Sequence, residues 1–305
     1  MNGNTFFFPW EVNLMAWLQA SLSGAGASIL SFFSMFGEEL ALILVLGFLY
    51  WCFDKKLGKT LGLSILTALT WSVMIKNIIL RRRPYFDNEG IKILRVVEPE
   101  ADIYDISAQG YSFPSSHSGN AAALFGSLAI GVKKKWLTAL AIAIPLLTGI
   151  SRVVVGAHYP TDVLAGLALG AACAFLIPVL EKKLKNKLLL YALILVTVLP
   201  GLFFCKSADY FTGLGLLLGF MGGTLFEEKH VRFSETKKPL AIAARVLGGL
   251  AIYFLLNTAL KLPFSKEFLS GGSAAALWVR CARYAIIAFV DFGVYPMLFK
   301  VGIWA

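Results

Sequence analysis

Apolar runs long enough to cross a bilayer follow one another along most of the chain, and short polar breaks separate them. A helix needs about 20 apolar residues to cross the roughly 30 Å of hydrocarbon in a bilayer. The pattern predicts spans near residues 38–53, 58–80, 115–132, 136–156, 160–181, 187–205, 208–226, 239–262 and 275–299. We therefore expect an all-α fold, a polytopic membrane helical bundle with about nine transmembrane helices.

The N-terminal stretch is apolar but irregular. Residues 9–36 are interrupted by Asn13, by Gln19 and by a Ser/Gly-rich stretch from Ser21 to Ser28. A segment of this kind suits the plane of the membrane interface. We expect an interfacial helix here, with a membrane crossing as the alternative.

Composition supports a membrane protein. Of the 305 residues, 58% are hydrophobic and 15% are charged, whereas soluble domains carry about 25% charged residues. The net charge of +10 lies largely in lysine clusters between apolar runs, a pattern that indicates topology and not a nucleic-acid partner. The four cysteines lack metal-ligand spacing, so we expect them to be buried apolar side chains. No metal or cofactor is expected. One membrane domain over residues 1–305 is expected, and its oligomeric state is left open.

The lysine clusters predict an orientation. If the spans alternate, one side receives three clusters: Lys55, Lys56 and Lys59; Lys133 to Lys135; and Lys182, Lys183, Lys185 and Lys187. Short loops rich in lysine and arginine stay in the cytoplasm. The long loop from Arg81 to about Phe113 and the turn around His158 then share the opposite, non-cytoplasmic face.

Two further features concern helix packing. The pairs Gly166 with Gly170 and Gly215 with Gly219 have the four-residue spacing that lets membrane helices approach closely. Three charged residues in the last span are costly in lipid and should face protein or a water-filled cavity. They are Arg280, Arg283 and Asp291, and the sequence assigns them no role.

The first candidate for chemistry is a pair of cations. Lys76 lies near the end of the second span, and Arg83 follows seven residues later, immediately before Pro84. Seven residues are nearly two helical turns, so we expect both side chains on one face. The pair suits an anionic ligand, and the alternative is a cluster of cations that snorkel to the interface.

The second candidate is the run Pro114-Ser115-Ser116-His117, where the long loop meets an apolar helix. A serine is a good N-cap, and the free backbone N–H groups and the dipole of a helix N-terminus attract an anion. His117 would then stand in the first turn. The alternative is an ordinary cap with an incidental histidine.

The third candidate is a histidine between an arginine and a carboxylate. Arg152 precedes His158 by six residues, and Asp162 follows four residues later. A carboxylate can hold one ring nitrogen of a histidine and leave the other free to attack, while a guanidinium binds phosphate oxygens in pairs. A structural Arg–Asp pair at a helix turn is the alternative.

Together, the three segments resemble the signature of the type 2 phosphatidic acid phosphatase (PAP2) superfamily, which reads KxxxxxxRP, PSGH and SRxxxxxHxxxD. Every charged position is filled. Ser116 stands where the family usually has glycine, and we expect it to keep the backbone donors but to narrow the phosphate cradle. The resemblance covers residues from about 58 to 181, and the helices from about 187 to 299 are additional to this core.

The resemblance implies a metal-independent phosphatase with a phosphohistidine intermediate. His158 would be the nucleophile, Asp162 would orient it, and His117 would protonate the leaving group. The phosphate would be held by Lys76, Arg83, Ser115, Ser116 and Arg152.

Several substrates fit such a site. A site at the membrane surface suits a lipid phosphate monoester of the phosphatidate or sphingoid-base-phosphate type. The segment 37–58 and the extra spans after residue 181 loosely resemble the sphingosine-phosphate phosphatase branch. The layout is also similar to glucose-6-phosphatases, and other relatives dephosphorylate isoprenoid diphosphates. A soluble vanadium haloperoxidase has a similar anion site, but the apolar spans argue against it.

Two readings from other classes remain, a transporter of phosphate or phospholipid and an inactive scaffold. A carrier has no need for His158 beside Asp162 and opposite His117, and a scaffold has no need for a complete set of residues. We expect a multi-pass protein of a bacterial plasma membrane whose site faces outward, with the lumenal face of the endoplasmic reticulum as the alternative.

Overall fold

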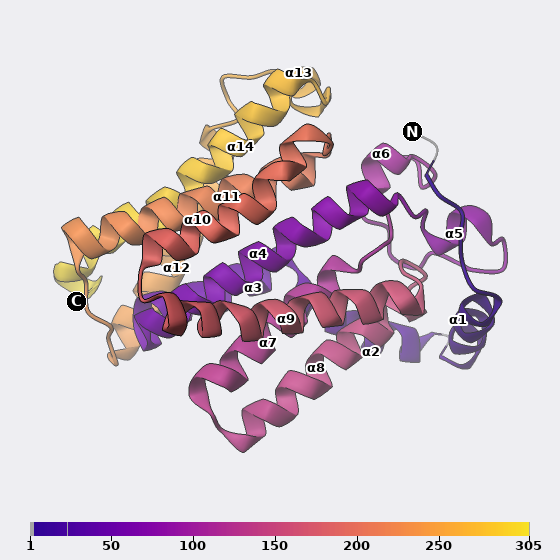
Figure 1. Cartoon of the computed structure of the whole chain (residues 1–305), viewed down its shortest axis with the longest axis horizontal. Coiled ribbons are helices and arrows are strands. Elements are labelled where there is room, and N and C mark those ends of the chain that lie inside the picture. Colours follow the sequence, from indigo (N-terminus) through magenta and orange to yellow (C-terminus); the bar gives the residue numbers. More distant parts are fainter. Residues whose placement is uncertain (1–2, 23, 305) are drawn as a thin grey trace. The chain divides into compact units, whose positions relative to one another are not determined.

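A computed structural model describes residues 3–22 and 24–304, and helices account for most of that range (Figure 1). The α-helices are α1 (Pro9–Ser21), α2 (Ala25–Phe32), α3 (Glu39–Phe48), α4 (Lys55–Ile79), α5 (Pro84–Asp87), α6 (Ile106–Gln109), α7 (Ser116–Val132), α8 (Lys135–Val154), α9 (Pro160–Leu184), α10 (Lys187–Val198), α11 (Ala208–Phe226), α12 (Pro239–Ala259), α13 (Lys266–Ser270) and α14 (Ala274–Phe289). Short 3-10 or π-helical turns are η1 (Phe33–Gly37), η2 (Leu49–Phe53), η3 (Leu199–Phe203), η4 (Glu227–Val231), η5 (Val290–Val294), η6 (Tyr295–Lys300) and η7 (Gly302–Trp304). The described residues contain no strand, and an all-α fold is confirmed.

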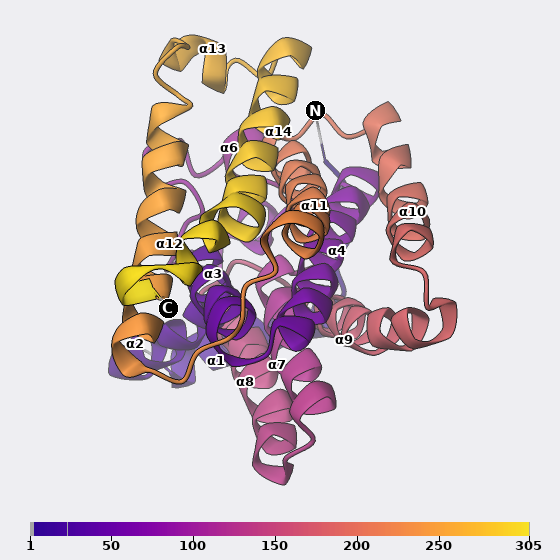
Figure 2. The same cartoon turned by 90° about the vertical axis from the view of Figure 1, so that its left-hand side faces the viewer.

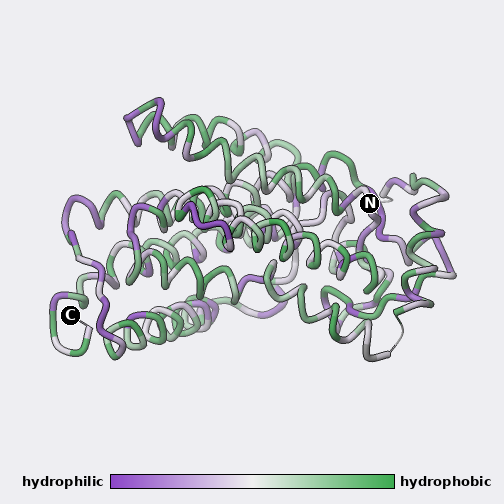
Figure 3. Tube along the Cα trace, turned by 90° about the horizontal axis from the view of Figure 1, so that it is seen from below, coloured by the Kyte–Doolittle hydropathy of each residue, from purple (hydrophilic) through white to green (hydrophobic). Residues whose placement is uncertain are grey.

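Each of the nine apolar stretches is helical, but the described helices do not all have the length of a span. Five are long and apolar enough to cross a membrane: Lys55–Ile79, Lys135–Val154, Pro160–Leu184, Pro239–Ala259 and Ala274–Lys300. A sixth is added if the N-terminal helices, bent by 113°, form one broken span. Hydrophobic residues follow the helices and hydrophilic residues gather at many connections (Figure 3). A multi-pass membrane protein is confirmed, whereas nine spans and an interfacial N-terminus stay predictions.

The contacts divide the chain into two compact units. Unit 1 comprises Met1–Ala41 and Trp71–Leu176, and unit 2 comprises Leu42–Thr70 and Ile177–Ala305. Helices α4 and α9 each contribute to both units. Two unit boundaries therefore fall inside apolar runs, where the sequence gives no sign of a domain border. All eight candidate site residues belong to unit 1. A single domain over the whole chain stays a prediction.

Within unit 1, α7 and α8 form an antiparallel hairpin (Figure 1, Figure 2). The turn is made by Lys133, whose φ of 57° ends α7 in the left-handed conformation. The start of α7 and the end of α8 therefore lie together, and the Lys133–Lys135 cluster lies at the other end. Because a helix rises 1.5 Å per residue, the two ends of α7 are about 25 Å apart.

Two glycines on α9 bring this helix against the start of α7. A Cβ atom on Gly166 would lie 2.3 Å from the Ser115 carbonyl oxygen, and one on Gly170 would lie 2.0 Å from that of Gly119. No other residue fits at such distances, so the close approach predicted from the glycine spacing is confirmed. The Ser115 N–H donates to the Asp162 carbonyl at 2.9 Å, which ties the starts of α7 and α9 together.

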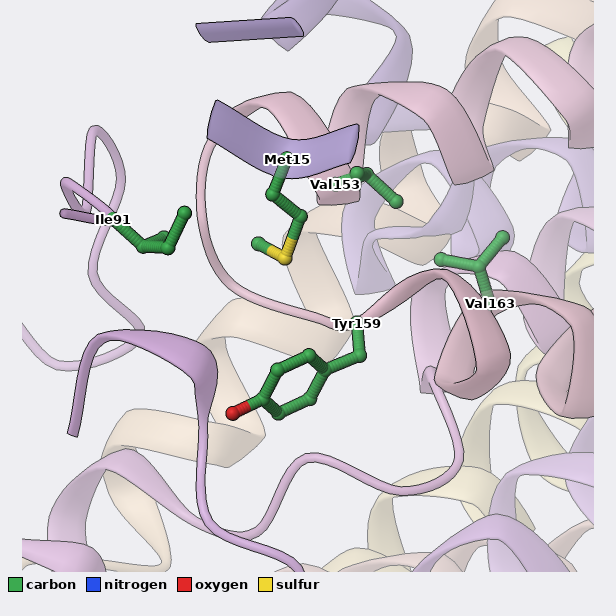
Figure 4. Close-up of a cluster of buried hydrophobic side chains, with 5 residues drawn as sticks. All are labelled: Met15, Ile91, Val153, Tyr159 and Val163. Atoms are coloured by element: carbon green, nitrogen blue, oxygen red, sulfur yellow. The ribbon is translucent and has the colours of Figure 1, made fainter. Parts of the chain in front are cut away.

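Helix α1 packs on the turn between α8 and α9. Met15 is fully buried and points toward the ring of Tyr159, in a cluster completed by Ile91, Val153 and Val163 (Figure 4). The Gln19 amide donates to the Lys92 and Val154 carbonyls at 2.7 and 2.9 Å. The N-terminal segment is thus fixed beside the segment that carries His158.

The structure of unit 2 shows where the charged residues of the last span lie. Gly215 and Gly219 of α11 pack on the backbone of α14, as their spacing predicted. Arg283 and Asp291 are buried in protein, and Arg283 Nη2 donates to Asn257 Oδ1 at 3.1 Å. The expectation that these charges face protein is confirmed for both, and Arg280 is half-buried. The four cysteines are free and buried, also as expected.

Candidate active site

Lys76 and Arg83 do not share a helical face, and this prediction was wrong. Helix α4 ends at Ile79, Leu80 has a φ of 56°, and Arg83 has extended backbone as the N-cap of α5. The residue before a proline disfavours the helical conformation, and Arg83 precedes Pro84. The spacing of the two cations therefore spans a helix end and not two helical turns.

One loop nevertheless brings the two cations together. Lys76 Nζ donates to the carbonyls of Tyr111 and Ser112 at 2.7 and 3.3 Å. Arg83 Nε donates to the carbonyls of Gln109 and Gly110 at 2.9 and 3.0 Å. Consecutive carbonyls of residues 109–112 thus hold both cations, and the long outer loop is part of the site.

The start of α7 has the predicted geometry. Ser115 is the N-cap, and its hydroxyl accepts from the Ser118 N–H at 3.4 Å. Ser116 Oγ lies 2.8 Å from the Ser72 hydroxyl on α4, which anchors the residue that replaces the family's glycine. His117 follows in the first turn and is half-buried. The backbone of Gly37 lies so close that a Cβ there would be 2.4 Å from the His117 carbonyl oxygen.

Arg152, near the end of α8, is buried with an unused hydrogen-bond donor. Its side chain is 3% exposed, and Nη1 donates to Ser34 Oγ at 3.3 Å. The Ser34 hydroxyl is itself paired with Ser151 at 2.7 Å. Arg152 Nε has no hydrogen-bond partner among the described residues. A buried donor of this kind is rare and costly unless something fills it, and an anion would fill it.

His158 and Asp162 lie together, but not in direct hydrogen-bond contact. His158 Nδ1 is 3.7 Å from Asp162 Oδ2, which is longer than a hydrogen bond. The Ser112 hydroxyl donates to Asp162 Oδ2 and lies 3.4 Å from His158 Nδ1. The Tyr159 N–H also donates to Asp162 Oδ2, at 2.7 Å. Asp162 thus lies beside His158, but the predicted direct hydrogen bond is not formed, and Ser112, which the sequence did not single out, contacts both residues.

Arg81 and Glu11 are further members of the site that sequence reasoning missed. Arg81 donates to Asp162 Oδ1 at 2.6 Å and to Glu11 Oε2 at 2.7 Å, and all three side chains are at most 1% exposed. The guanidinium also stacks over the Tyr159 ring at 4.0 Å. The available signals were Arg81 beside the first motif and Glu11 as an isolated acid in an apolar stretch.

The electrostatics of the site favour an anion and a neutral nucleophile. Burial lowers the pKa of His158 well below its usual range, and the nearby positive charges of Arg83, Lys76 and Arg152 lower it further. His158 is consequently a neutral imidazole at neutral pH, with a lone pair available for attack. The same three cations act on His117, so both histidines and all three predicted phosphate-binding cations belong to one site.

His230 lies outside this constellation. It is exposed on η4 of unit 2, and its ring packs against Phe226. It is therefore a surface residue, and it provides a control for experiments on the other two histidines.

The model of the PAP2 superfamily matches residues 57–185, and the model described as PAP2 superfamily phosphatase, transmembrane extension, matches residues 211–303. The chain is 30% identical to the undecaprenyl-diphosphatase of Sulfolobus acidocaldarius over 158 residues, 52% of this chain and 69% of the relative. No solved structure gives a significant match.

Other relatives match shorter stretches. Phosphatidylglycerophosphatase B of Bacillus subtilis is 37% identical over 90 residues, 27% of this chain and 44% of that protein. A lipid A 1-phosphatase of Rhizobium johnstonii is 50% identical over 60 residues, 20% of this chain and 24% of that protein. The chain thus spans less than half of these two relatives. The family models and the longer match show that the chain belongs to the PAP2 superfamily of phosphatases.

Proposed function

We propose that the protein is an integral membrane phosphatase that hydrolyses a lipid phosphate monoester through a phosphohistidine intermediate. One observation carries the proposal: the buried Arg152, whose Nε donor is unfilled and whose carbonyl accepts from the His158 N–H at 3.3 Å, acts electrostatically with Lys76 and Arg83 on the same two histidines. A phosphate dianion needs charge neutralisation, a nucleophile and an acid for its leaving oxygen. The site supplies a candidate for each.

The chemistry then runs in two steps. Lys76, Arg83, Arg152 and the start of α7 at Ser115 and Ser116 hold the non-bridging oxygens. His158 attacks phosphorus as the bond to the leaving oxygen breaks. The bound phosphate dianion offsets the three cations, so that His117 is protonated in the complex and gives the leaving oxygen a proton. In the second step His117 takes a proton from water, which attacks the phosphohistidine and releases inorganic phosphate.

A lipid is the substrate class favoured by the setting of the site. The site lies in a chain of membrane-spanning helices, where an amphiphile can present its head group and keep its tails in lipid. The names of the three relatives described above refer to phosphatidylglycerophosphate, lipid A and undecaprenyl diphosphate. We place a phosphatidate or sphingoid-base-phosphate monoester first, with an isoprenoid diphosphate or a sugar phosphate as the alternative.

The decisive experiment compares phosphate release by wild type, His158→Ala and His230→Ala, each purified in detergent. The substrates are phosphatidate, sphingosine phosphate, an isoprenoid diphosphate and glucose 6-phosphate, with and without EDTA. We expect release that resists EDTA, survives His230→Ala and is lost in folded His158→Ala, with radiolabelled phosphate trapped on His158. Binding without release by well-folded wild type would overturn the proposal and favour a carrier.

The orientation is a separate proposal, namely that the site faces outward across a bacterial plasma membrane. It is supported by the Lys133–Lys135 cluster, which lies about 25 Å from the site along α7, because such clusters stay in the cytoplasm. Single cysteines at Glu100 and Lys134 test it, since both positions are exposed and the native cysteines are buried. An impermeant maleimide should label only Glu100→Cys in intact cells, and labelling of only Lys134→Cys would reverse the orientation.

A further inference from the structure

Ser112 touches both members of the pair that defines the nucleophile. Its hydroxyl donates to Asp162 Oδ2 and lies 3.4 Å from His158 Nδ1, whereas the histidine and the carboxylate are 3.7 Å apart. Hydrogen bonds of a catalytic site are often long in the free enzyme and tighten when the substrate binds. The contact between Asp162 and His158 therefore runs through a serine.

The position of each proton follows from this arrangement. Asp162 receives Arg81 Nη1, the Tyr159 N–H and the Ser112 hydroxyl, and an ionised carboxylate only accepts hydrogen bonds. The Ser112 proton is thus directed to Asp162, and Ser112 Oγ can only accept from His158. That requirement places the ring proton on Nδ1 and leaves the lone pair on Nε2.

Ser112 is held firmly enough to impose this choice. The residue is fully buried. Its backbone N–H donates to the Arg81 carbonyl at 2.8 Å, and its own carbonyl accepts from Lys76 Nζ at 3.3 Å. The hydroxyl is therefore anchored between a residue that holds Asp162 and a residue proposed to hold phosphate. Outer partners of this kind set the orientation and tautomer of a reactive histidine.

We propose that Ser112 is a positioning residue that links Asp162 to His158 and fixes the Nδ1–H tautomer, an inference that rests on the proposed phosphatase function. In the covalent step, the Nε2 lone pair forms a bond to phosphorus while the bond from phosphorus to the leaving oxygen breaks. Nδ1 keeps its proton, so the ring becomes cationic, and the carboxylate balances this charge through the Ser112 hydroxyl. His117 delivers the proton to the leaving oxygen.

The first test is kinetic and uses matched variants. Ser112→Ala removes the hydroxyl, Ser112→Thr keeps it, and Ser127→Ala truncates another buried serine of unit 1 whose hydroxyl has no partner among the described residues. We expect Ser112→Ala to slow phosphoenzyme formation by about 10- to 100-fold, with vanadate inhibition unchanged. Ser112→Thr should recover most of the rate, and Ser127→Ala should match wild type.

The second test needs no substrate. Nitrogen NMR of histidine-labelled protein should show His158 as the Nδ1–H tautomer in wild type and Ser112→Thr, and a loss of that preference in Ser112→Ala. If Ser112→Ala does not fold, Ser112→Val compared with the isosteric Ser112→Thr isolates the hydroxyl. Wild-type rate and tautomer in the variants without a hydroxyl would overturn the role of Ser112. Failure of wild type to form a phosphoenzyme would instead overturn the proposed function, and the NMR result would still decide the tautomer.

Discussion

Two buried arginines, one in each unit, show why burial alone does not mark a binding residue. Arg245 in unit 2 is 2% exposed and Arg152 in unit 1 is 3% exposed. Arg245 donates to the carbonyls of Trp304, Trp51, Ser234 and Phe299. Arg152 donates to Ser34 Oγ, and its Nε has no partner among the described residues.

The difference lies in how the donors are used. Arg245 also stacks on the Phe299 ring at 4.3 Å, and each of its three side-chain nitrogens has a backbone acceptor within unit 2. Arg152 is also removed from water, but it lacks a full set of hydrogen-bond acceptors to offset the cost of its burial. A fixed donor that is held away from water interacts strongly with an anion that reaches it. Incomplete hydrogen bonding thus distinguishes Arg152 from Arg245. Arg283 in unit 2 also has an Nε without a partner among the described residues, so an unfilled donor marks a candidate binding arginine only where other candidate site residues surround it.

The prediction with the largest expected effect extends this comparison to a third arginine, Arg81. Arg81 is paired with both Asp162 and Glu11, so Arg81→Gln leaves two buried carboxylates without the guanidinium that they share. Loss of one partner from a buried ion pair costs about 3–5 kcal/mol of folding free energy. Glu11→Gln in the same chain removes one carboxylate and should restore part of that stability. Thermal unfolding of the two single variants and the double variant measures the coupling.

A simple sum of the two single effects would contradict this account of the Glu11–Arg81–Asp162 network. Residues in one network couple, and independent residues add. A partly exposed pair, Arg95 with Glu38 at 2.7 Å, is a suitable comparison, because ion pairs near the surface contribute only about 0–1 kcal/mol.

The second prediction tests the two arginines of the comparison directly. Arg152→Gln should lower kcat/KM by about 100-fold or more, the usual effect of removing one donor that stabilises a transition state, with little change in Tm. Arg245→Gln should leave kcat unchanged in folded protein and cost about 1–3 kcal/mol of stability, because buried carbonyls lose their donor. Phosphate release and thermal unfolding on the same preparations give both quantities. The opposite pattern would refute the distinction between the two arginines.

The sequence predicted those parts of the fold and site that depend on local pattern. The apolar runs predicted the helices, including the start of α9 at residue 160, and Ser115 predicted the start of α7. Gly166 and Gly170 gave the close approach of α9 to α7, because only a glycine permits a backbone contact at that distance. These signals are local, and tertiary contacts confirm them.

The missed parts depend on residues brought together from distant positions. Ser112 lies 46 residues from His158 and 50 from Asp162, and Glu11 lies 70 residues from Arg81. No spacing rule reports such pairs. The prediction that Lys76 and Arg83 share a helical face was wrong for a different reason, because α4 ends before Arg83. The carbonyls of the outer loop bind both cations instead.

The third prediction concerns pH and has a moderate effect. Burial and the surrounding cations lower the pKa of His158 from its usual 6.5, so the unfolded chain binds a proton at a pH where the folded protein does not. Stability is then complete above about pH 6.5 and falls as the pH drops toward the folded pKa. We expect His158 to stay neutral at about pH 6 in nitrogen NMR.

The cations provide the control for this pH dependence. Arg152→Gln removes one of the three charges that lower the pKa of His158, so the histidine should protonate at a higher pH in that variant. A fall of the His158 pKa in Arg152→Gln, or protonation of His158 in wild type near pH 6.5, would contradict the electrostatic account of the site.

The smallest expected effect concerns Ser116, the departure from the family signature. Its backbone N–H survives in Ser116→Gly, while the hydroxyl that contacts Ser72 at 2.8 Å is lost. Since the amide is the donor that a helix N-terminus offers an anion, turnover of a monoester should change by only about two- to threefold. The added room should favour a diphosphate, so the ratio of kcat/KM for an isoprenoid diphosphate to that for phosphatidate should rise. Ser72→Ala, which frees the Ser116 hydroxyl without removing it, should leave this ratio near wild type. A loss of about 100-fold in monoester turnover would mean that the hydroxyl itself binds phosphate, and Ser116 would then belong with Arg152 among the groups whose donors the ligand completes.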